Sequence, residues 1–70
     1  MSDKDEKRLK RWVEDFHAEH LRWPTVAEAA RAMRTRQQQV ADIVDAAGGW
    51  MELRSWFIDD RLAAHTVELR

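Results

Sequence analysis

Four consecutive polar side chains in the middle of the chain, Arg36-Gln37-Gln38-Gln39, carry groups suited to reading nucleic-acid bases. A glutamine amide can pair with the N6 and N7 atoms of adenine, and a guanidinium group binds phosphate. Thr35-x-x-Gln38 also has the spacing of a capping box, in which two side chains satisfy free amides at a helix start. The pattern therefore predicts that these polar groups lie in the first turn of a helix, where the helix dipole favours anions.

A second capping box, Thr25-x-x-Glu28, lies ten residues earlier in the chain. Two helix starts this close leave room for one short helix, a tight turn and a second helix. That order of elements is the skeleton of a helix-turn-helix.

An apolar stripe at positions i, i+3, i+4 and i+7, typical of an amphipathic helix, occurs three times. The stripes are Leu9, Trp12, Val13 and Phe16; Val26, Ala29, Ala30 and Met33; and Val40, Ile43, Val44 and Ala47. We expect helices over residues 4–20, 26–33 and 35–47. Pro24 separates the first two because the residue before a proline disfavours helix, and Gly48-Gly49 is the expected stop of the third.

The last third of the chain favours a β-hairpin. Residues 50–58 are rich in apolar and aromatic side chains, residues 65–69 alternate as a half-buried strand does, and Asp59-Asp60-Arg61 can form the turn. We expect strands near 51–58 and 63–69. The expected fold class is therefore α+β, with a three-helix helix-turn-helix core followed by a C-terminal hairpin. Leu53, Trp56 and Phe57 also fit helical spacing, so the alternative is an all-α four-helix fold.

Length and composition restrict the class of protein. Seventy residues make a single domain, 1–70, with a thin core. The chain has no cysteine, no apolar run near the roughly 20 residues of a membrane span, and no apolar signal segment at its charged N-terminus. We expect a cytoplasmic protein with no membrane contact, no cofactor and no metal.

An enzyme is the weakest interpretation. His17 and His20 lack the His-Glu-x-x-His arrangement of zinc proteases, and Gly48 and Gly49, the only glycines, do not form a phosphate-binding loop. No catalytic residue is assigned, and we expect no enzymatic activity.

Charge is unevenly distributed along the chain, whose net charge is −1. Residues 22–41 carry four arginines and one glutamate, a net charge of +3, whereas residues 1–21 are at −1 and residues 42–70 at −3. The only basic block is thus the one that holds both capping boxes, which favours an anionic partner there.

Three helices followed by a hairpin resemble the winged helix-turn-helix superfamily of DNA-binding domains. The apolar spacings of that unit are matched by Val26, Ala29, Met33, Val40, Ile43 and Val44. Ala30 stands where the two helices need a small residue. Arg34 replaces the usual turn glycine and Thr35 a common apolar residue, which fits the looser turns of winged domains.

The resemblance implies sequence-specific binding of double-stranded DNA, with helix 35–47 in the major groove, as in a small transcriptional regulator. The expected DNA-contacting residues are Arg31, Arg34, Thr35, Arg36, Gln37, Gln38 and Gln39, with Arg54 and Arg61 if the hairpin is a wing. Gln38 is expected to point most directly outward. Asp42 and Asp45 share its face and would repel phosphates, so we expect only the opening turns of the helix to touch DNA.

The main alternative function is protein–protein interaction. Four tryptophans are many for so small a core. The strand expected near 51–58 is apolar on both faces, and each of these faces must pack against other parts of the protein or a partner. A homodimer through the hairpin or the first helix would bury such surface and would suit a palindromic DNA site.

Overall fold

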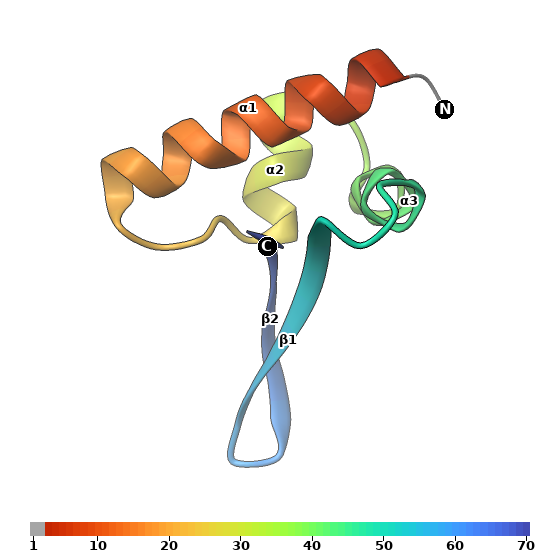
Figure 1. The fold of residues 1–70 in the computed structure, drawn as a ribbon. Coiled ribbons are helices and arrows are strands. Elements are labelled where there is room, and N and C mark those ends of the chain that lie inside the picture. The colour runs from red at the N-terminus through yellow and green to blue at the C-terminus, as the bar shows by residue number, and fades with distance from the viewer. Residues whose placement is uncertain (1–2) are drawn as a thin grey trace.

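Three helices followed by an antiparallel hairpin make up the computed structural model, which describes residues 3–70. The elements are α1 (Asp3–His20), α2 (Val26–Met33), α3 (Gln37–Ala46), β1 (Met51–Ile58) and β2 (Arg61–Leu69). The helices gather at one end of the molecule and the hairpin projects away from them (Figure 1). The α+β prediction is confirmed, and the four-helix alternative is wrong. Within residues 3–70, no helix is both long and apolar enough to cross a membrane.

The first capping box forms as predicted at the start of α2. The Glu28 amide donates to Thr25 Oγ1 at 3.1 Å, and the Thr25 amide donates to Glu28 Oε1 at 3.0 Å. Arg22 donates two further hydrogen bonds to the same carboxylate, at 3.0 and 3.1 Å. The Arg22 hydrogen bond is the main reason why the pKa of Glu28 falls from 4.5 to about 2. Because the folded-state pKa is the lower one, this stabilisation is complete above pH 4.5 and is lost as the pH falls towards 2.

The second capping box does not form, so that prediction is wrong. The N-cap of α3 is Arg36, not Thr35, and no side chain caps this helix start. The cause is the end of α2, where Thr35 N–H donates to Ala30 O and Arg34 N–H donates to Arg31 O. This pair of bonds is a Schellman motif, which uses Thr35 to close α2. The first residue able to open the next helix is therefore Arg36.

The two threonines are thus expected to differ in their effect on stability. Thr25→Ala removes a hydroxyl that accepts from the Glu28 amide, so we expect a loss of about 1 kcal/mol in the free energy of unfolding. Thr35→Ala serves as the matched control and is expected to change it by less than about 0.5 kcal/mol. Urea denaturation measures the free energy of unfolding of the two variants. Equal losses would contradict the assignment of Thr25, and not Thr35, as a helix cap.

The hairpin closes through a two-residue turn at Asp59 and Asp60, whose φ angles are 51° and 64°. Positive φ at both positions is the type I′ geometry that suits the twist of a hairpin, and Asp tolerates it. β2 therefore begins at Arg61, two residues before the predicted start at 63. The register shifts between Trp56 and Phe57, which pair with Ala64 and Leu62, so Ala63 is the extra residue of a bulge.

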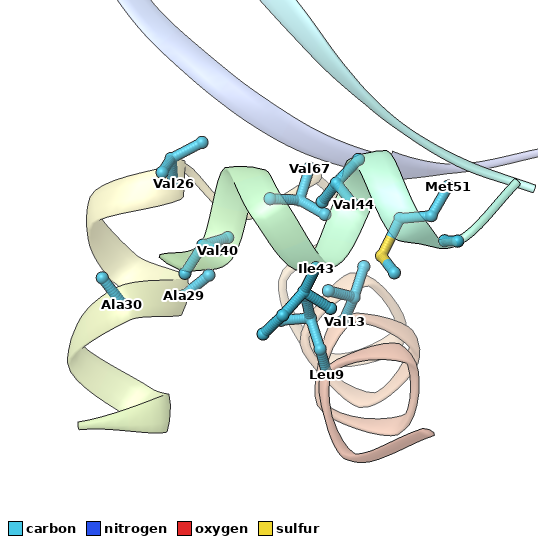
Figure 2. Close-up of a cluster of buried hydrophobic side chains, with 11 residues drawn as sticks. Leu9, Val13, Val26, Ala29, Ala30, Val40, Ile43, Val44, Met51 and Val67 are labelled. Atoms are coloured by element: carbon cyan, nitrogen blue, oxygen red, sulfur yellow. The ribbon is translucent and has the colours of Figure 1, made fainter. Parts of the chain in front are cut away.

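The core lies where the three helices meet the base of the hairpin, and it contains most of the apolar stripes predicted from sequence (Figure 2). Trp12 and Met33 are only partly buried against it, and Phe16 lies outside it. Its buried members are Leu9, Val13, Val26, Ala29, Ala30, Val40, Ile43, Val44, Ala47, Met51 and Val67. Val67 N–H also donates to Pro24 O at 2.9 Å, and Thr25 forms a β-bridge with Thr66. The connection between α1 and α2 thereby ties the base of the hairpin to the helices.

Candidate nucleic-acid interface

The expected DNA-contacting residues of the helical part gather around the connection between α2 and α3. We call the side chains of Arg31, Arg34, Thr35, Arg36, Gln37, Gln38 and Gln39 the turn surface. All of them are exposed except Thr35, which is half-buried. Six of these seven predicted residues are thus exposed to solvent around the connection between α2 and α3.

Arg34 occupies the left-handed region, with φ 56° and ψ 47°. A side chain in this conformation costs about 1–2 kcal/mol relative to glycine's free access to it. The position is the C-terminal cap of α2, where glycine is the common residue. Arg34 therefore holds an exposed guanidinium at the turn at some cost in stability.

The three arginines of the turn surface are not neutralised locally. Among residues 3–70, the ion pairs are Lys10–Glu14, Arg22–Glu28, Arg54–Glu68 and Arg70–Glu52. None of them involves Arg31, Arg34 or Arg36. Arg22, which contributed to the basic block in the sequence, is instead committed to Glu28. The positive charge of this block is thus concentrated at the turn surface.

The three glutamines point in different directions from the start of α3. Gln37 lines a depression with residues 62–65 of β2, whereas Gln39 lines another with Arg8 of α1 and Arg34. Gln38 lies between them and donates from Nε2 to Asp42 Oδ1 at 3.0 Å. Its carbonyl oxygen and its second amide N–H remain available to a base edge.

The backbone at the start of α3 adds free donors to the turn surface. The first hydrogen bonds of the helix run from the Gln39 and Val40 amides to Arg36 O, at 3.0 and 3.3 Å. The Gln37 and Gln38 amides precede them, and no side chain caps the helix. Uncapped amides at a helix start, together with the helix dipole, are suited to a phosphate.

The hairpin arginines are less suited to DNA than the sequence indicated. Arg54 lies over the ring of Trp56, with 4.6 Å to its centroid, and 3.8 Å from Glu68 Oε1. Arg61 lies at the hairpin tip as expected, but directly after Asp59 and Asp60. Two carboxylates beside one guanidinium leave the tip with a net negative charge.

One basic residue near the turn surface was not expected from the sequence. Arg8 of α1 shares a depression with Arg34 and Gln39, next to Asp5. No local pattern could have indicated this, because Arg8 is brought there only by the packing of α1 against the other helices.

A comparison of Arg34→Gly with Arg34→Ala is expected to show the backbone strain at this position separately from the loss of its charge. Removing the left-handed side chain relieves about 1–2 kcal/mol, and the added freedom of the unfolded chain offsets about 0.4–1 of it, so we expect a gain of about 0.5–1 kcal/mol in the free energy of unfolding. Arg34→Ala removes the same charge but keeps the strain, so it is expected to show no gain. Thermal unfolding of both variants measures this, and equal stability would contradict the assigned conformation.

No protein-family model, curated protein or solved structure matches this chain in the comparisons with known proteins.

Proposed function

We propose that the protein is a sequence-specific DNA-binding domain of the winged helix-turn-helix kind, acting in the cytoplasm as a small transcriptional regulator. The observation that carries the proposal is the turn surface. Three arginines that form no ion pair with the described side chains surround a helix start that has free amides and three exposed glutamines. This combines phosphate-binding groups with groups that read base edges.

In the proposed complex, α3 enters the major groove of double-stranded DNA with its N-terminus first. Arg31, Arg34 and Arg36 bind phosphates, while Gln38 faces the base edges with Gln37 and Gln39 on either side of it. Asp42 is one helical turn further along, and Asp45 lies beyond it. Their negative charge limits the contact to the opening turns of α3.

The hairpin has a smaller part in this proposal than a typical wing. Asp59 and Asp60 repel phosphates at its tip, and Arg54 is engaged by Trp56 and Glu68. Arg61 is the one hairpin residue that we retain as a candidate phosphate contact.

An NMR titration with a mixed-sequence duplex tests the proposal. The amides of residues 31–39 are expected to shift at low salt, while those of residues 51–57 stay in place. Shifts confined to the hairpin, or no shifts at all, would contradict it.

Protein–protein interaction is the second candidate function, because large apolar side chains are exposed on the hairpin. Trp56, Phe57 and Leu62 are 45%, 64% and 53% exposed. Exposed apolar surface of this kind marks interaction sites.

A further inference from the structure

The outer edge of β1 presents backbone groups that the domain itself leaves without a partner. Opposite residues of an antiparallel pair alternate between pairs that exchange hydrogen bonds and pairs whose backbone groups point away from each other. Leu53 faces Val67, whose N–H donates away from β1 to Pro24 O. The backbone groups of Leu53, and by alternation those of Ser55 and Phe57, therefore point away from β2.

No backbone group in the described part of the chain pairs with this edge. Among residues 3–70, the backbone hydrogen bonds outside helices and the hairpin ladder include none from Leu53, Ser55 or Phe57. On β2, by contrast, the bridge between Thr25 and Thr66 covers part of the opposite edge. β1 is thus the open edge of the sheet.

β1 has few of the usual features that protect an edge strand. Such strands are commonly short, or carry proline, charged side chains (lysine above all) or a bulge. The two charged side chains of β1, Glu52 and Arg54, are paired with Arg70 and Glu68. β1 is eight residues long and contains neither proline nor lysine, and the bulge residue Ala63 belongs to β2. Its arginine, Arg54, lies over the ring of Trp56.

The apolar side chains at the far end of the hairpin also need a cover. Trp56 and Phe57 lie on opposite faces of β1, and Phe57 pairs with Leu62 beyond the reach of the core. An isolated two-stranded hairpin is marginally stable in water, so this projecting end gains most from a further strand (Figure 1).

We propose that β1 pairs antiparallel with β1 of a second copy of the chain, about a two-fold axis at Ser55, to form a four-stranded sheet. This register sets Leu53 opposite the partner's Phe57 on one face. On the other face it sets Arg54 opposite the partner's Trp56. Both contacts occur twice by symmetry and cover the exposed side chains of Trp56 and Phe57.

The registers with the axis at Arg54 or at Leu53 are less favourable. An axis at Arg54 places two arginines directly opposite each other, and like charges in that position destabilise a sheet. An axis at Leu53 sets the partner's Phe57 opposite Gly49, outside the strand, and leaves it uncovered. The self-complementarity at Ser55 favours a second copy over an unrelated partner, and this pairing does not depend on DNA binding.

Sedimentation equilibrium from micromolar to hundreds of micromolar protein tests the proposal. The wild-type chain is expected to form a dimer, and Ser55→Pro is expected to raise its dissociation constant by about 100-fold, because a pair of backbone hydrogen bonds is lost. The Ser55 N–H points away from β2, so proline there leaves the hairpin ladder intact. Ser55→Ala is the control and is expected to dimerise as the wild type does.

A cysteine variant tests the register without relying on the proline variant. The chain has no cysteine of its own. In Ser55→Cys the introduced cysteines of the two copies meet at the two-fold axis. Their Cα atoms are about 5.5 Å apart, which is within the range of a disulfide. Rapid oxidation to a covalent dimer is expected there but not in Ala63→Cys, on the other strand. A wild-type chain that stays monomeric, a Ser55→Pro variant that folds and still dimerises, or equal cross-linking of the two cysteine variants would each overturn the proposal.

Discussion

Replacing Arg36 and Gln38 together by alanine is expected to weaken binding to a selected DNA duplex by about 100-fold, because one phosphate contact and one base contact of about 1–3 kcal/mol are lost. The fold is expected to remain intact, since both side chains are exposed and neither caps α3. Among the described residues, the only side-chain hydrogen bond that disappears is the one from Gln38 to Asp42.

The measurement requires a target, which selection from a random-sequence duplex library provides. Fluorescence anisotropy then gives the dissociation constants of wild type and variant for the enriched duplex. Arg11→Ala is the control, because it removes the same charge from an exposed position on α1. Unchanged affinity in the double variant, or an equal loss in the control, would rule out the docking of α3 in the major groove.

Leu9→Ala is expected to have the largest effect on stability. Leu9 is fully buried in α1 among the core residues of all three helices (Figure 2). Its truncation is expected to cost about 2–5 kcal/mol. A domain of this length has a total free energy of unfolding of roughly 4–10 kcal/mol, so much of its stability would be lost. The expected fall in Tm is roughly 10–30 °C.

Leu21 offers a matched control for this substitution. The same atoms are removed in Leu21→Ala, but this side chain is 84% exposed. The change in the free energy of unfolding is expected to stay within about 0.5 kcal/mol. Calorimetry of both variants makes the comparison, and similar losses in the two would show that the core is not organised around α1.

The helices could be predicted because each has a single dominant pattern, whereas the hairpin was favoured over a fourth helix mainly by the alternation of residues 65–69. The stripe of Val40, Ile43 and Val44 marks the buried face of α3, and the alternation around Val67 marks β2. The start of α3 could not be predicted from Thr35-x-x-Gln38 alone. Thr35 N–H instead donates to Ala30 O and so closes α2. This hydrogen bond depends on the left-handed conformation of Arg34.

The exposure of the candidate site residues on α3 could be predicted, because the position of a residue on a helix decides which side of the helix its side chain faces. The glutamines face outward as expected, and the hydrogen bond from Gln38 to Asp42 follows from their i, i+4 spacing. The engagement of Arg54 could not be predicted, because Glu68 meets it only through the pairing of β1 with β2. The exposure of the turn surface could therefore be predicted from the sequence, whereas the local contacts of the hairpin arginine Arg54 could not.

The dependence of DNA affinity on salt tests the central claim most directly. If Arg31, Arg34 and Arg36 each bind a phosphate, counterion release gives a plot of log binding constant against log salt concentration with a slope of about −3. We expect this slope for the wild-type protein and the selected duplex, measured by anisotropy at several salt concentrations. A slope near zero, or no binding at low salt, would contradict the proposal that the turn surface binds DNA.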